Sequence, residues 1–241
     1  MELFKSFGDK VAFHKQRSQR IEALADGVFA IVMTLLVLDI RTPMNGMDTE
    51  KGLLLSLYHT IPKIFTFVLS FSLVGQFWVI LTNQFNHIQE SDRNSIIIVV
   101  FFLLFVSLLP FSTSFLSEHL WSRVAIGFYV FNILLIILTG TMHWLYSWHT
   151  GLVKLAEDKG IVIHKAIMRL AKTALISYGI VAVSCFFSNR LALYATILLQ
   201  ILFTFIGFFE MINSAWKKKL SIMHIANSKN KKALRNLHDA S

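Results

Sequence analysis

Two ionisable residues of opposite charge, Arg20 and Asp26, stand at the start of a long apolar segment, residues 20–40. About 20 helical residues span the roughly 30 Å hydrocarbon core of a bilayer, so this segment is predicted to be a transmembrane helix. Charged side chains are costly there and mark a functional or architectural role. Because six positions separate the two residues, instead of the three or four that favour a direct pair, we interpret them as parts of a network completed by other helices.

One face of the same segment carries large apolar side chains. At 100° per residue, Ile31, Leu35 and Leu38 fall within about 60° of one another, Thr34 flanks them, and Asp26 points about 140° away from Ile31. Such a stripe can line a pore by placing rings of branched side chains around it. It can equally face lipid or neighbouring helices, and periodicity alone favours this second interpretation.

Other kinds of chemistry find little support in the sequence. No two of the nine histidines form a helical i, i+4 metal motif with a carboxylate between them, and the aromatic and histidine residues of 143–149 are predicted to form an interfacial belt. There is no phosphate-binding glycine loop, no GxSxG motif and no TVGYG-like filter. We therefore predict no enzymatic activity, metal or cofactor. The lone Cys185 lies in a span and is predicted to be a buried small residue.

The elements that must position these residues are transmembrane helices. Of the 241 residues, 55% are hydrophobic and only 15% are charged, which is typical of a polytopic membrane protein. We predict an all-α fold with a cytoplasmic N-terminal arm (1–19), a six-helix membrane domain (20–216) and a basic C-terminal tail (217–241). Pro62 and Pro110 can kink their helices. The predicted spans lie near 21–40, 60–82, 95–116, 124–147, 173–188 and 191–212.

The last two predicted spans are close together. The segment 173–188 is short for a crossing, and only Ser188, Asn189 and Arg190 separate it from the next apolar segment. One long bent helix would also fit the sequence. The polar triplet favours a tight hairpin.

Lysine and arginine are concentrated in alternate connecting regions. They occur in the N-terminal arm, in the predicted loop near 148–172 and in the tail, whereas the intervening loops carry few. This asymmetry predicts that both termini are cytoplasmic. Basic segments beside membrane spans attract anionic lipid, which explains the net charge of +9. A nucleic-acid partner is therefore not expected.

The chain resembles the transmembrane protein 175 family of potassium channels, in the shorter prokaryotic form with six helices. The resemblance is carried by Arg20, by the run from Leu24 to Ile31 that contains Asp26, and by the run from Thr34 to Leu38. Further matches are Phe77–Trp78, Asp92–Arg93 and the segment 108–113, Leu-Leu-Pro-Phe-Ser-Thr. The first half of the chain is covered well, the second half only by its number of spans.

Three positions depart from the family pattern. Leu24 and Ala25 replace a phenylalanine and a serine, and Leu81 stands where the family usually has a histidine. The resemblance implies a hydrogen-bond network that joins the first helices. In this chain the network would have fewer members, namely Arg20, Asp26 and Trp78. We expect these departures to affect stability or gating rather than the permeation path.

The resemblance also implies a homotetramer in the bilayer, with the first helices lining a central pore for potassium ions. Ile31 matches the family's narrowest constriction, Leu35 and Leu38 the apolar layers beyond it, and Thr34 a nearby hydroxyl. The expected function is a weakly potassium-selective channel whose hydrophobic constriction is both gate and filter. The single six-helix unit and the lack of a targeting segment suggest a prokaryotic plasma membrane.

Three alternatives remain open. A secondary transporter would need a midplane substrate site, and a non-conducting scaffold would use the basic tail to bind lipid or a partner. A proton leak is a further possibility within the channel class, because the resembled family has been linked to proton flux.

Overall fold

The described part of this computed structural model comprises residues 2–38, 40, 49–88, 90–154 and 157–206. The chain divides into two compact units, Met1–Gln200 and Ile201–Ser241. Within the described ranges the structure is helical apart from turns and one isolated bridge between Ile88 and Val153. The named helices are α1 (Glu2–Leu38), α2 (Glu50–His87), α3 (Arg93–Ser107), α4 (Leu109–Glu118), α5 (Arg123–His149) and α6 (Glu157–Phe187).

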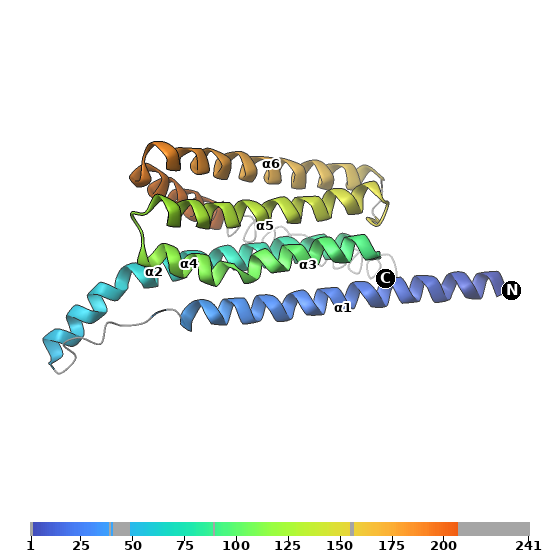
Figure 1. The fold of residues 1–241 in the computed structure, drawn as a ribbon. Coiled ribbons are helices and arrows are strands. Elements are labelled where there is room, and N and C mark those ends of the chain that lie inside the picture. The colour runs from blue at the N-terminus through green and yellow to red at the C-terminus, as the bar shows by residue number, and fades with distance from the viewer. Residues whose placement is uncertain (1, 39, 41–48, 89, 155–156, 207–241) are drawn as a thin grey trace, which may run out of the picture. The chain divides into compact units, whose positions relative to one another are not determined.

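Among the described residues, six helical segments are long and apolar enough to cross a membrane, which confirms the predicted number of spans. The third segment, Arg93–Glu118, combines α3 and α4, and the last, Asn189–Ile206, follows α6 after a break at Ser188. The chain reverses direction after this break (Figure 1), so the predicted hairpin between the last two spans is confirmed. The predicted end of the last span, residues 207–212, and the C-terminal tail lie outside the described residues.

The fifth span is longer than the sequence suggested. We predicted a short apolar crossing at 173–188 preceded by a loop near 148–172, but α6 begins at Glu157. The prediction was wrong because apolar content was used to find the start of the helix. Basic residues with long aliphatic stems are good helix formers and extend the helix by several turns before its apolar part.

Local sequence signals explain where the second and third spans start and bend. The side chain of Thr49 accepts a hydrogen bond from Gly52 N at the start of α2, and Asp92 accepts one from Ser95 N, at 2.8 Å, at the start of α3. Pro110 lies in the first turn of α4, where the third span breaks at Leu108. Pro62 lies inside α2, which bends in Figure 1, because a proline cannot donate the helical hydrogen bond.

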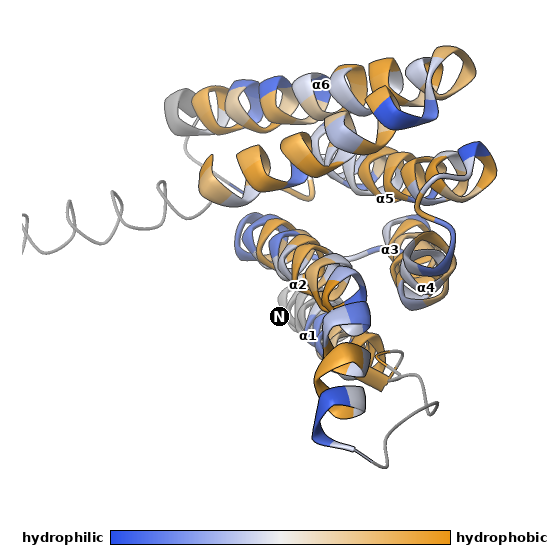
Figure 2. Cartoon of the chain, turned by 90° about the vertical axis from the view of Figure 1, so that its left-hand side faces the viewer, coloured by the Kyte–Doolittle hydropathy of each residue, from blue (hydrophilic) through white to orange (hydrophobic). Residues whose placement is uncertain are grey.

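The helices of the first unit pack in an antiparallel series (Figure 1). α1 contacts α2, α3 and α4; α5 contacts α3 and α4 on one side and α6 on the other. Figure 2 shows hydrophobic residues on the outward as well as the inward faces of the helices. Outward apolar surface is what a polytopic membrane protein presents to lipid.

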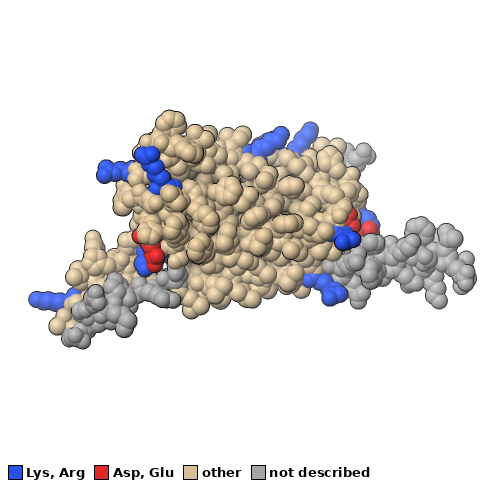
Figure 3. All heavy atoms as spheres, viewed as in Figure 1, with Lys and Arg blue, Asp and Glu red and all other residues tan. Residues whose placement is uncertain are grey.

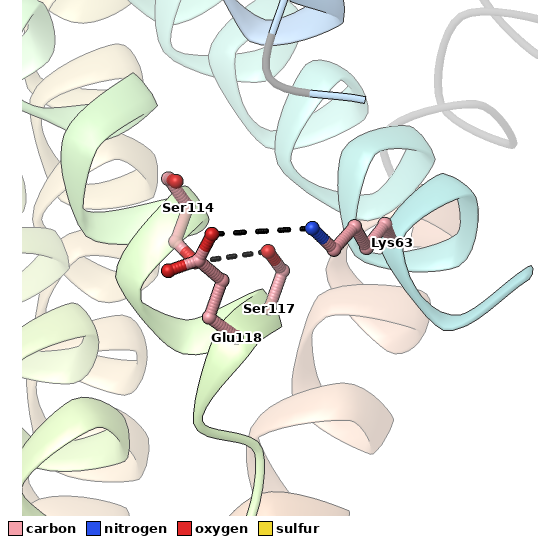
Figure 4. A network of polar contacts seen from close by, with 4 residues as sticks. All are labelled: Lys63, Ser114, Ser117 and Glu118. Carbon is pink, nitrogen blue, oxygen red and sulfur yellow. Dashed lines mark hydrogen bonds and ion pairs between the residues drawn. The ribbon is translucent and has the colours of Figure 1, made fainter. Parts of the chain in front are cut away.

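Charged groups gather at the two ends of these helices. At one end Lys63 of α2 reaches Glu118 of α4, with Nζ and Oε1 3.9 Å apart, beside a hydrogen bond from Ser117 to the Ser114 carbonyl (Figure 4). At the other end Lys154 pairs with Glu90 at 2.5 Å. Figure 3 shows a wide area without charged atoms between the two ends, apart from lysine and arginine atoms at the upper edge, over α6. Ion pairs that are this exposed add little to stability, but they mark the borders of the apolar band.

Candidate functional site

The buried face of α1 fixes its orientation in the subunit. Ala25, Phe29, Val32 and Leu36 follow one another at spacings of three or four residues and are all at most 2% exposed. The Phe29 ring packs against Phe102 of α3 with centroids 6.2 Å apart. This packing leaves other residues of α1, among them Ile31, Leu35 and Leu38, exposed within one chain.

The predicted stripe lies on such an uncovered face. Ile31, Leu35 and Leu38 are 59%, 43% and 69% exposed, and the stripe lies about 120° around the helix from the centre of the buried face. Leu24 and Gly27 continue it toward the N-terminus of the span, and both are exposed. The structure thus gathers the predicted apolar residues on one open surface of the subunit.

Thr34, beside this stripe, has its hydroxyl oriented by the backbone. Its Oγ1 donates a hydrogen bond to the Ile31 carbonyl at 2.8 Å. A hydroxyl has one hydrogen to donate and two lone pairs to accept with. With the hydrogen used inside the helix, the lone pairs of this exposed oxygen are left to face whatever lies beside α1.

Asp26 and Trp78 are brought together. The indole Nε1 of Trp78, on α2, donates to Oδ1 of Asp26 at 2.8 Å and thereby links the first two spans. Arg20 is exposed, and it forms no hydrogen bond or ion pair with any residue that the structure describes. Of the three predicted network residues, two are therefore in contact within one subunit.

The three departures from the family pattern occupy different environments. Ala25 is buried at 2% exposure and Leu81 at 3%, whereas Leu24 is half exposed on the stripe face. Alanine and leucine at the two buried positions bring no polar group that needs a partner. The departures thus remove hydrogen-bonding groups without leaving buried polar atoms behind.

A buried polar cluster joins α2, α3 and α5, and sequence reasoning missed it. Nδ1 of His143 lies 2.8 Å from Oε1 of Gln84, and its Nε2 lies 3.1 Å from the Ser95 hydroxyl. Nε2 of Gln84 donates to the Gly140 carbonyl at 3.2 Å. Every side chain in this cluster is nearly inaccessible, so its hydrogen bonds replace those that water would make. The signal was available, because Gln84 and His143 are polar residues within apolar segments.

The predicted aromatic belt is only partly correct. His143 and Trp144 are fully buried, while Trp148 is half-buried and His149 exposed. Trp148 stacks on His164 of α6 with ring centroids 4.4 Å apart. The helical period explains the difference: neighbouring residues on α5 point in different directions, so a run of five cannot all face the interface.

A second buried cluster joins α2, α4, α5 and the last span. The Tyr129 hydroxyl is 2.9 Å from that of Ser70, which accepts a hydrogen bond from Thr113 at 3.0 Å. Nε2 of Gln200 also donates to the Tyr129 hydroxyl. Side-chain hydrogen bonds of this kind fix how spans pack, since lipid supplies no alternative partners.

No group of three or more metal-ligating side chains occurs among the described residues. The exposed surface that the sequence singled out is instead apolar, with the Thr34 hydroxyl at its edge. The chemistry open to such a surface is packing against apolar groups and contact with a partly dehydrated ion.

Comparisons with known proteins bear on this geometry. Residues 20–110 match the family described as the endosomal/lysosomal potassium channel TMEM175. A potassium channel of Streptomyces collinus is 33% identical over 138 residues, which is 56% of this chain and 66% of that protein. A potassium channel of Chamaesiphon minutus is 34% identical over 131 residues, 53% of this chain and 64% of that protein. The aligned part thus spans about two thirds of these relatives.

The fold also matches a solved structure. The crystal structure of a lysosomal potassium-selective channel TMEM175 homolog from Chamaesiphon minutus aligns with a TM-score of 0.68 and 29% sequence identity. The alignment covers 79% of this chain and 97% of that one. The structural similarity thus extends well past residues 20–110.

Proposed function

We propose that this chain is a channel of the TMEM175 family, permeable to potassium and weakly selective over sodium, that assembles as a homotetramer in the cell membrane of a prokaryote. In the proposed assembly the α1 helices of four subunits surround one central pore. Both termini face the cytoplasm, as the distribution of lysine and arginine favours.

One observation carries the proposal. α1 keeps a four-turn stripe of apolar side chains, from Leu24 to Leu38, uncovered by its own subunit, while its other side packs against α2, α3 and α4. In a tetramer built around α1, four copies of this stripe enclose an apolar passage. Ile31 forms the narrowest ring, and Leu35 and Leu38 form the rings that follow it.

The mechanism follows from the chemistry of these rings. Branched apolar side chains close a narrow passage because water does not wet it, and hydrated ions cannot cross a passage that contains no water. An ion that crosses the rings must shed part of its hydration without protein oxygens to replace it. Potassium holds its hydration shell more weakly than sodium does, so it pays the smaller cost. Modest selectivity is the expected result.

Opening requires α1 to rotate or to move outward. The Asp26–Trp78 hydrogen bond is then a hinge point, because it ties the start of the lining helix to α2 without blocking the stripe. Thr34 is the only hydroxyl-bearing residue in the segment 31–38, and the lone pairs of its oxygen give a passing cation one oxygen per subunit.

The test is ion flux from liposomes that contain the purified protein. We compare the natural chain with Ile31→Asn and, as a matched control, Val37→Asn, which places the same polar group on another exposed face of α1. The expected result is potassium-favouring flux that grows in Ile31→Asn and not in the control, because a polar ring hydrates the constriction.

Other outcomes point to other functions. Folded protein without flux in either ionic solution refutes the channel and favours a scaffold. Saturable uptake coupled to protons favours a secondary transporter. Acidification of the vesicles without potassium movement indicates a proton leak.

A further inference from the structure

The outer face of α6 carries cations in a regular line. Lys165, Arg169 and Lys172 follow one another at spacings of four and three residues, and all three are exposed. Three exposed apolar side chains then continue the same face toward the other end of the helix: Ile176 at 62%, Ile180 at 65% and Val183 at 57%. At 100° per residue all six lie within about 80° of one another. We call this set the α6 stripe.

The α6 stripe faces away from the subunit. The buried residues of the same helix, Tyr178, Val181 and Cys185, lie on the opposite side, and α6 packs chiefly against α5. Figure 3 shows lysine and arginine atoms projecting from the upper edge of the molecule, over α6. The stripe is thus open to whatever surrounds the protein in the membrane.

Aromatic residues mark the depth of the cations. Trp148, half-buried at the end of α5, stacks on His164, and Trp and His rings of this kind settle at the level of the lipid headgroups. Lys165 is the next residue. At 1.5 Å per residue, Arg169 and Lys172 lie roughly 6 and 10 Å further along the helix, on the side of the hydrocarbon.

These cations are without carboxylate partners in the described part of the chain, where the ion pairs involve Lys63 and Lys154 instead. A cation at the edge of the hydrocarbon is costly unless it reaches water or a counter-ion. Long side chains can extend toward the interface, and there the abundant anionic group is a lipid phosphate.

We propose that the α6 stripe is a binding site for one anionic phospholipid of the inner leaflet. The headgroup phosphate lies among Lys165, Arg169 and Lys172, and an acyl chain lies along Ile176, Ile180 and Val183. Cations followed by apolar side chains match the order of groups in such a lipid. The fit depends on α6 continuing as one helix through both parts, as it does.

The test counts lipids that stay bound to the purified full-length chain in native mass spectrometry, with phosphatidylglycerol and phosphatidylcholine as probes. The variant is Lys165→Gln with Arg169→Gln and Lys172→Gln. The control, Lys217→Gln with Lys218→Gln and Lys219→Gln, removes the same charge elsewhere. We expect phosphatidylglycerol to bind roughly tenfold more weakly to the variant, and equally to the control and the natural chain, with phosphatidylcholine binding unchanged.

Three results would overturn the proposal. Unchanged phosphatidylglycerol binding in the variant shows that the three cations hold no lipid phosphate and extend into water instead. Equal losses in variant and control show diffuse attraction without a site. A change in the number of subunits in the same spectra shows that the face is an interface between copies. A charge-keeping variant, Lys165→Arg with Lys172→Arg, must still bind phosphatidylglycerol, which separates loss of the site from loss of the fold.

Discussion

Trp78 donates its indole hydrogen to the Asp26 carboxylate across 2.8 Å, and this bond joins the start of the first membrane span, on α1, to α2. Asp26 would otherwise place a carboxylate at the start of a membrane span with no donor from its own helix. A hydrogen bond to a charged group is stronger than one between neutral groups, and the surrounding lipid offers no substitute. The pair therefore sets where α1 stands relative to α2.

Replacing Trp78 by phenylalanine removes this donor and keeps most of the ring. We expect the protein to lose about 1 kcal/mol of stability, because the Asp26 carboxylate is left without its partner. Thermal unfolding in detergent measures the change. Trp121→Phe is the control, since Trp121 is exposed, its ring contacts the Tyr194 ring, and its hydrogen bond with Asn189 uses the backbone carbonyl, which the substitution keeps. Equal shifts in the two variants would contradict the role of the bond.

The His143 cluster predicts a non-additive pair of substitutions. Gln84→Leu and His143→Phe each leave a buried polar group of the other residue without its partner, so each is expected to cost roughly 1–3 kcal/mol. The double variant removes both polar groups and is expected to cost less than the sum.

Chemical or thermal unfolding of the four proteins checks this expectation. His149→Phe serves as the exposed control on the same helix. If the losses of unfolding free energy were additive, Gln84 and His143 would stabilise the fold independently. The hydrogen bond between them would then make no separate contribution.

Gly140 is predicted to tolerate no larger side chain, not even the methyl group of alanine. A Cβ at this position would come within 3.2 Å of Cε2 and 3.4 Å of Cδ2 of Phe102, so the ring of a buried phenylalanine must move. We expect Gly140→Ala to destabilise the protein by roughly 1–3 kcal/mol in spite of the better helix propensity of alanine.

Gly179→Ala provides the comparison for Gly140, because a Cβ there meets no atom within 4 Å. It should be neutral or should stabilise the helix by up to about 1 kcal/mol. The two melting temperatures therefore move in opposite directions if close packing at Phe102 is what requires the glycine.

The number of spans and the residues on the uncovered face of α1 were within reach of the sequence for different reasons. Spans follow from length and hydrophobicity, which are local properties. The residues on the uncovered face of α1 follow from helical periodicity, but periodicity cannot tell a face open to a pore from a face open to lipid. That distinction depends on neighbouring subunits, which a single sequence segment does not describe.

Two errors show where local reasoning failed. The start of α6 was missed because Lys165, Arg169 and Lys172 lowered the apolar content of a segment that is nonetheless helical. The burial of His143 was missed because its partners, Gln84 and Ser95, belong to two other helices. Contacts between distant segments depend on how spans pack, and no short window of sequence contains that information.

Thr34→Ala tests the contribution of the hydroxyl to ion preference. The Thr34 hydrogen is held by the Ile31 carbonyl at 2.8 Å, so what faces the proposed pore is the acceptor side of the oxygen. We expect the alanine variant to conduct but to have a changed potassium-to-sodium permeability ratio, measured as the reversal potential under bi-ionic conditions. Thr34→Ser keeps the oxygen and should keep the ratio. An unchanged ratio in the alanine variant would leave the apolar rings alone as the source of selectivity.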